Sequence, residues 1–213
     1  MSDEQFVTQT MLTCLGNKRK LVGEIKNIAQ EIAATLDKEK MRIVDGFSGS
    51  TVVSRELASL AYDIHCNDME NYAYLMAKCF MEKPSEEQQK EIASYINSMN
   101  NLAENGPYVE GIITKLYAPN NTIDIKEGER VFYTRENALI IDTLRSYISM
   151  VVPQHLQHYC LVPLLTRASI HANTAGVFKG FYKDGKIGKF GGAGENALER
   201  ITKPIRLDVP IWS

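Results

Sequence analysis

The sequence of 213 residues contains four cysteines and no Cys-x-x-Cys pair. Cys14, Cys66, Cys79 and Cys160 are scattered along the chain, without the spacing of a zinc site or of a small disulfide-stabilised domain. Free thiols of this kind are typical of a reducing compartment. We therefore expect a cytoplasmic protein with neither a metal site nor a disulfide framework.

Long hydrophobic runs and an excess of one charge are also absent. No apolar stretch approaches the roughly 18 residues that a membrane helix requires, and the N-terminal segment MSDEQFVTQT is polar and acidic, so we expect no membrane span and no signal peptide. The formal net charge of -2 gives no global nucleic-acid signature, and DNA binding would depend on local basic patches. The hydrophobic content of 44% suits a globular domain with a sizeable core.

The first 80 residues show the pattern of an α/β unit. Apolar residues recur at helical spacing over residues 18–38, and MRIVD (41–45) then has the composition of a short buried strand. A helix is predicted over 51–60, a second strand over 62–68 and a third helix over 69–81. This order predicts parallel strands joined by helical crossovers.

After Phe80 the pattern becomes mainly helical. A polar helix is predicted to begin after Pro84 with Ser85 as its cap, and residues 106–134 are rich in turn signals. Two more helices are predicted over 135–150 and 153–170. The glycine-rich stretch KDGKIGKFGGAG (183–194) is expected to be a mobile loop, ENALERI (195–201) a helix, and IRLDVPIW (205–212) a strand.

Three short stretches form the chemically informative constellation. CLGNKRKLV (14–22) turns at Gly16-Asn17 before a basic helix start, VDGFSGST (44–51) follows the first strand, and HCNDMEN (65–71) places Asp68 about 20 residues after the glycine loop. Alone, the glycine stretch is equally typical of an ordinary strand-to-helix turn, Asp68 is more typical of a helix cap, and GNKRKL is more typical of a solvated basic helix start. In this order they indicate a loop that cradles a nucleotide-like cofactor and an acid that accepts hydrogen bonds from ribose hydroxyls.

The order GNKRKL, DGFSGS and NDMEN, continued by ERVFYTRENALIIDTLR and HANTAGVFKGFYK, resembles the D12 class of DNA adenine methylases over residues 9–210. The resemblance implies an α/β, Rossmann-like SAM-dependent methyltransferase domain with an inserted mainly helical target-recognition subdomain. It implies a SAM-binding part over 9–80, the insertion over 81–169 and a return to the α/β domain over 170–213. It also implies transfer of a methyl group from S-adenosyl-L-methionine to N6 of adenine in duplex DNA, within a restriction-modification system.

Residue by residue, the resemblance assigns six positions to the cofactor. Lys18 matches the family's lysine near the cofactor carboxylate, and Asp68 matches its ribose-side acid. Two positions depart from the family: Cys14 replaces an aromatic residue, and Thr51 stands where many members have another glycine. Both departures predict weaker binding of the same ligand. The predicted cofactor-binding residues are Cys14, Lys18, Asp45, Phe47, Gly49 and Asp68.

The family's catalytic motif Asp-Pro-Pro-Tyr does not occur in the sequence. The nearest match is NGPY, with Asn105 and Tyr108 as weak catalytic candidates within the expected insertion. We therefore expect the chain to stop before its catalytic loop, as a truncated product, an engineered piece or one subunit of a split enzyme whose second chain carries that loop. A non-catalytic DNA-binding fragment and a small-molecule or RNA methyltransferase are the alternatives, and the recognition-like segment 106–145 disfavours the last.

Four basic residues are predicted to contact DNA. Arg130 and Arg135 are assigned by resemblance only. Lys179 and Lys183 belong to a basic run interleaved with aromatic residues, a composition that suits phosphate contacts beside an extruded base. A solvated loop explains that run equally well.

Overall fold

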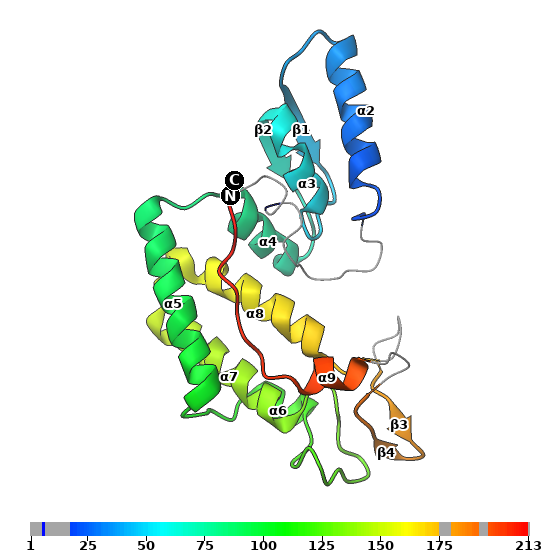
Figure 1. Cartoon of the computed structure of the whole chain (residues 1–213), viewed down its shortest axis with the longest axis vertical. Helices are drawn as coiled ribbons and strands as arrows, with labels where there is room; N and C mark the ends of the chain where they lie inside the picture. Colours follow the sequence, from blue (N-terminus) through cyan, green and yellow to red (C-terminus); the bar gives the residue numbers. More distant parts are fainter. Residues whose placement is uncertain (1–5, 7–17, 175–179, 192–195, 213) are drawn as a thin grey trace. The chain divides into compact units, whose positions relative to one another are not determined.

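The computed structural model describes residues 6, 18–174, 180–191 and 196–212, which form two compact units (Figure 1). The first unit comprises the described part of Met1–Ser85 together with that of Pro210–Ser213, and the second comprises that of Glu86–Val209. Among the described residues, no helix is long and apolar enough to cross a membrane.

The first unit has the predicted helix and strand order. Helix α2 (Val22–Thr35) precedes strand β1 (Met41–Asp45), followed by α3 (Val52–Leu57) with a short 3-10 turn, η1 (Ala58–Leu60), then β2 (Ala61–Cys66) and α4 (Asn71–Met81). The two strands are parallel, with Ile43 opposite Ile64 and Asp45 opposite Cys66. The register therefore brings the ends of both strands, and the loops that follow them, to the same edge.

An arginine lies inside the core of the first unit. Arg55 of α3 is only 2% exposed, with its guanidinium carbon 4.5 Å from the ring centroid of Phe80 and 5.3 Å from that of Phe6. Burial, together with the positive charge of Arg19, lowers the pKa of Arg55 to about 10. The indole N–H of Trp212 donates to the carbonyl oxygen of Cys79 at 2.7 Å, which ties the C-terminal segment to α4.

The second unit is mainly helical, as predicted. It contains α5 (Glu86–Asn105), α6 (Ile112–Tyr117), α7 (Arg135–Val151), the 3-10 turn η2 (Gln154–Leu156), α8 (Gln157–His171), strands β3 (Lys183–Asp184) and β4 (Ile187–Gly188), and α9 (Ala197–Thr202). Its core is built from apolar side chains of α5, α7 and the turn before α8, including Ile92, Ile96, Met99, Leu144, Ile148 and Leu156.

Two predicted loops contain regular structure. Helix α6 lies within 106–134 because the buried carboxylate of Asp142 on α7 accepts hydrogen bonds from the backbone N–H groups of Gly111, Ile113 and Thr114. The mobile loop predicted at 183–194 is wrong for residues 183–188. These form the antiparallel hairpin β3–β4, whose turn contains Gly185 in the left-handed region (φ 59°). Residues 192–195 lie outside the described part.

The strand predicted over 205–212 is also wrong, since this segment belongs to no sheet. Two asparagine side chains replace the neighbouring strand. The backbone N–H groups of Ile205 and Leu207 donate to the amide oxygens of Asn137 (3.1 Å) and Asn100 (2.8 Å). The described residues of 170–209 belong to the second unit, whereas the prediction joined 170–213 to the α/β part. The functional roles given to the predicted parts stay predictions.

Candidate functional site

The glycine loop after β1 is fastened to the residues after β2. The backbone N–H of Gly49 donates to Asp68 Oδ2 at 2.8 Å, and that of Ser48 donates to the carbonyl of Asn67 at 2.9 Å. In return, the Asn67 backbone N–H donates to the carbonyl of Asp45, and its side-chain amide donates to that of Gly46 at 3.0 Å. The loop's backbone is thus fixed by four hydrogen bonds in one place. Asn67 was not predicted, although its position at the end of β2 could have indicated it.

The carboxyl pKa of Asp68 is lowered because backbone N–H donors surround its carboxylate. The N–H groups of Glu70, Gly49 and Met69 lower the pKa of this carboxyl, with Glu70 contributing most, at 3.0 Å from Oδ1. The side chain remains partly exposed, so its unused lone pairs are accessible. A carboxylate in this position can hold the loop and still accept hydrogen bonds from a vicinal diol.

The other predicted loop residues divide into an inward and an outward group. Asp45 Oδ2 accepts a hydrogen bond of 2.6 Å from the hydroxyl of Ser54 on α3, so this carboxylate anchors the loop to the helix. Phe47 is 90% exposed, and the Cα atoms of Gly46 and Gly49 have open space where a Cβ would stand. This outer surface of the loop allows close approach of a flat ligand to the backbone.

The backbone conformation at Thr51 is one that glycine adopts more easily. Its backbone lies in the left-handed region (φ 63°), where a β-branched residue is strained. The side chain is nevertheless fully buried, and its hydroxyl donates to the carbonyl of Ser50 at 2.6 Å. Lys18 is exposed just before α2, and Cys14 lies outside the described residues.

The NGPY stretch lies at the end of α5 in the second unit, where both candidate side chains bond to that helix. The phenol of Tyr108 donates to the carbonyl of Ala103 at 3.0 Å, and the Asn105 amide donates to Asn101 Oδ1 at 2.8 Å. Gly106 ends the helix in the left-handed conformation (φ 68°). The local geometry is that of a helix terminus. A catalytic role of Asn105 and Tyr108 stays a prediction that no contact here tests.

The predicted DNA-contacting residues of the second unit have local partners. Arg130 lies 5.9 Å from the ring centroid of Tyr117, and Arg135 pairs with Glu110 at 2.9 Å. Lys183 lies 5.3 Å from the ring centroid of Phe181. Lys179 is outside the described residues. Arg130 thus lies on the α6–α7 loop, Arg135 at the start of α7 and Lys183 on the hairpin, and their role with DNA stays a prediction.

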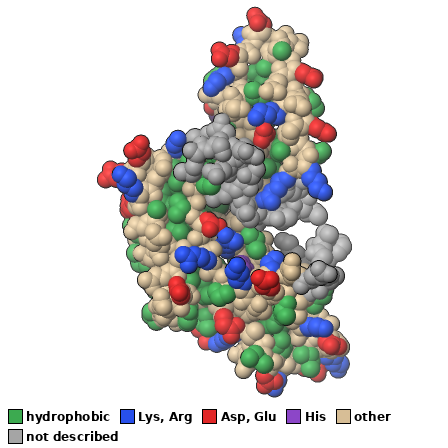
Figure 2. All heavy atoms as spheres, viewed as in Figure 1, with side chains coloured by type: hydrophobic (Ala, Val, Ile, Leu, Met, Phe, Trp, Pro, Cys, Tyr) green, Lys and Arg blue, Asp and Glu red, His purple; other side chains and the backbone are tan. Residues whose placement is uncertain are grey.

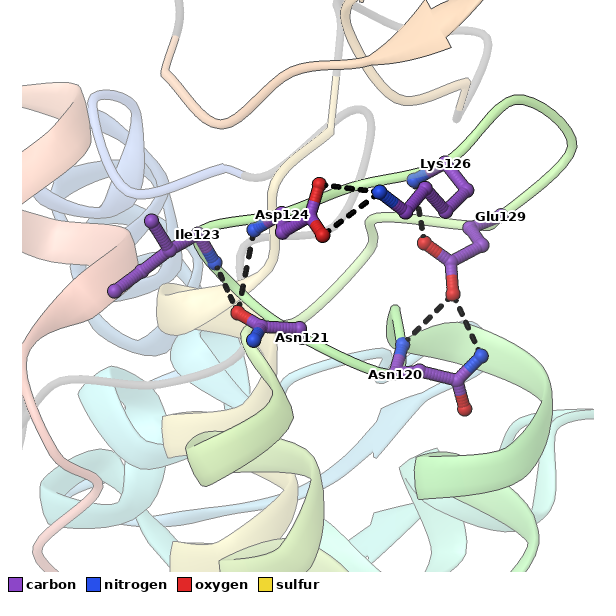
Figure 3. A network of polar contacts seen from close by, with 6 residues as sticks. All are labelled: Asn120, Asn121, Ile123, Asp124, Lys126 and Glu129. Carbon is purple, nitrogen blue, oxygen red and sulfur yellow. Dashed lines mark hydrogen bonds and ion pairs between the residues drawn. The ribbon is translucent and has the colours of Figure 1, made fainter.

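The loop between α6 and α7 is ordered by its own polar side chains (Figure 3). Glu129 accepts from the backbone N–H groups of Asn120 (2.9 Å) and Lys126 (2.7 Å), and these bonds lower the pKa of its carboxyl. The side-chain oxygen of Asn121 accepts from the N–H groups of Ile123 and Asp124. Arg130, which follows directly, therefore projects from a loop with a defined backbone.

A family model matches most of this chain. The model of the D12 class N6 adenine-specific DNA methyltransferases matches residues 15–190, which include the loop after β1, Asp68 and the α6–α7 loop. The chain belongs to this family. Membership of this family implies the Rossmann-like fold of a SAM-dependent methyltransferase. The parallel β1–β2 pair and its helices agree with that fold. Residues 15–190 therefore carry the family resemblance seen in the sequence.

Two curated relatives align with most of this chain. It is 28% identical over 176 residues to the type II methyltransferase M.CviAII of Paramecium bursaria Chlorella virus 1, covering 79% of this chain and 48% of the relative. It is 24% identical over 184 residues to the type II methyltransferase M.NlaIII of Neisseria lactamica, covering 80% and 49%. The chain thus spans about half the length of these relatives. No solved structure matches it.

Proposed function

We propose that this chain is the cofactor-binding and DNA-contacting portion of a SAM-dependent, adenine-specific DNA methyltransferase of a restriction-modification system. Membership of the D12 class and the type II methyltransferases among its relatives support this function. The observation that carries it is the 2.8 Å hydrogen bond from the Gly49 N–H to the Asp68 carboxylate. It unites the glycine loop and the acid that the family uses for its cofactor.

The proposed cofactor site lies on the outer surface of the loop after β1. Gly46 and Gly49 leave the backbone open to the ligand, the ring of Phe47 provides an apolar surface, and Asp68 accepts hydrogen bonds from the ribose hydroxyls. Lys18 and Cys14 are assigned to the cofactor by family resemblance alone. The bound cofactor supplies an electrophilic methyl group on sulfonium. The residues of this chain would orient it and hold its ribose in place.

The methyl transfer itself requires a group that selects the amine of an extruded adenine. The family's Asp-Pro-Pro-Tyr motif, absent from this sequence, has that role. The chain matches about half the length of its relatives, so the selection of adenine is proposed for the whole methyltransferase and is not assigned to residues of this sequence. Duplex DNA is the proposed substrate.

Calorimetric titration with S-adenosyl-L-methionine tests the cofactor site. Gly49→Ala places a side chain on the loop at φ 48°, and Gly185→Ala places one at φ 59° in the hairpin turn of the second unit. The two changes strain the backbone similarly, so Gly185→Ala is the matched control. We expect only Gly49→Ala to weaken binding. Saturable binding that both variants retain equally, or no binding by the wild type, would contradict the proposed site.

A further inference from the structure

A group of cations lies on the second unit around the end of α8. Arg167 and His171 stand one turn apart on α8, Arg200 belongs to α9, and Lys203 and Arg206 follow on the extended segment. Figure 2 shows Lys and Arg side chains gathered where the segment after α9 crosses this unit. Arg167, Arg200 and Lys203 are close enough together to act on one imidazole. Burial lowers the pKa of His171 most, and the charges of these three cations lower it further.

The backbone that carries this group is fixed by buried asparagines. The side-chain amide of Asn137 donates to the carbonyls of Ile201 and Lys203, each at 3.0 Å, and its oxygen accepts from the Ile205 N–H. Asn100 exchanges two hydrogen bonds with Leu207. Ile205 and Leu207 are buried, whereas Lys203 and Arg206 are exposed. The two cations therefore stand on a segment whose backbone these asparagines already hold in place.

Two of these cations already have polar partners in the protein. Arg167 pairs with Asp208, and Arg200 donates to the carbonyls of Ile170 and Ala172 at the end of α8. The side chains of Lys203 and Arg206 have no hydrogen-bond or ion-pair partner among the described residues. The surrounding carboxylates on the same stretch are Glu199 and Asp208, so the patch stays net positive in a chain whose overall charge is -2.

We propose that Lys203 and Arg206, supported by Arg167 and Arg200, form a contact surface for the phosphodiester backbone of duplex DNA. Three residues of extended chain span about 10 Å, so the two exposed cations are far enough apart to engage separate phosphates. Such contacts position the protein on the duplex without reading its sequence. The proposal rests on the proposed DNA methyltransferase function and adds a site separate from Arg130, Arg135 and the basic run at 179–189.

Fluorescence anisotropy with a labelled mixed-sequence duplex tests this surface at several salt concentrations. Each phosphate contact contributes about 0.9 to the slope of log affinity against log salt, so the double variant Lys203→Ala/Arg206→Ala should reduce that slope by about 1.8. Between 50 and 200 mM salt the wild type would then lose roughly tenfold more affinity than the double variant. Lys90→Ala, which removes an exposed lysine on α5, is the control and should leave the slope unchanged.

Charge-conserving and charge-adding variants sharpen the result. Arg206→Lys should retain binding, and Asp208→Asn, which releases Arg167 from its ion pair, should strengthen it. Circular dichroism of each variant shows whether the fold is kept. Duplex binding that the double variant leaves unchanged would overturn the surface while the proposed function stands. Cofactor binding without any duplex binding would overturn the surface together with the DNA part of that function.

Discussion

Asp68 offers the sharpest test of the cofactor site because its carboxylate has two duties. Its oxygens accept the backbone N–H groups of Gly49 at 2.8 Å and Glu70 at 3.0 Å, and the rest of the carboxylate is available to a ligand. Asp68→Ala removes all of these acceptors at once. In the cofactor-free protein, water can replace them at this partly exposed position, so we expect the free energy of unfolding to fall by only about 1 kcal/mol.

In the cofactor complex the loss should be larger. A hydrogen bond to a charged acceptor contributes about 1.5–3 kcal/mol, which corresponds to roughly 10- to 150-fold in the dissociation constant for S-adenosyl-L-methionine. Asp68→Asn keeps one oxygen acceptor and loses the charge, so its affinity should lie between those of the wild type and Asp68→Ala. Calorimetry measures the affinities, and urea unfolding measures the stability of each variant.

Asp63→Ala is the matched control for Asp68→Ala. Asp63 is also an aspartate of the β2 region, but it pairs with Arg42 at 2.9 Å and has no contact with the loop after β1 among the bonds described. Its removal should leave cofactor affinity unchanged. Equal affinities of wild type and Asp68→Ala would exclude Asp68 from the site. An equal loss in Asp63→Ala would show that the effect is not specific to the loop.

Three further outcomes are expected. The chain alone should transfer no tritiated methyl groups to duplex DNA, because its sequence lacks the Asp-Pro-Pro-Tyr motif that would align the adenine amine. A misplacement of about 1 Å can already lower the rate 100-fold. Incorporation that Tyr108→Ala abolishes would show that NGPY is catalytic. Asp37→Gly should raise the free energy of unfolding by about 1 kcal/mol in urea, since Asp37 has φ 50° after α2 and its charge opposes the helix dipole; a decrease would refute this. Burial lowers the pKa of His171 in the folded state, so its contribution to stability should be complete above pH 6.5, its ordinary pKa. Below that pH the unfolded chain binds more protons, and the contribution should be lost. The melting temperature, measured at pH 5–8, should therefore depend less on pH in His171→Gln than in the wild type.

The sequence by itself determined the elements of the first unit. The apolar run MRIVD, the glycines after it and the acid at Asp68 specify local conformations, and local pattern suffices to predict a strand, a turn and a following helix. The same pattern identified the D12 class, which the family model confirmed over residues 15–190. Helices α5, α7 and α8 were likewise predictable from their own sequence, and α7 also has a local cap, Thr134, whose hydroxyl accepts from the Asn137 N–H.

Only the tertiary structure decided the features that depend on partners far along the chain. Helix α6 is short and depends on Asp142, 28–31 residues away from the N–H groups that it caps, so no local signal predicts it. The apolar alternation of 205–212 predicted a strand, but Asn137 and Asn100 satisfy its backbone from 68 and 107 residues away, respectively. The hydrogen bond between Gly49 and Asp68 likewise required the parallel register of β1 and β2. Sequence patterns encode which conformation a segment favours, whereas the partner that satisfies its backbone is chosen by packing.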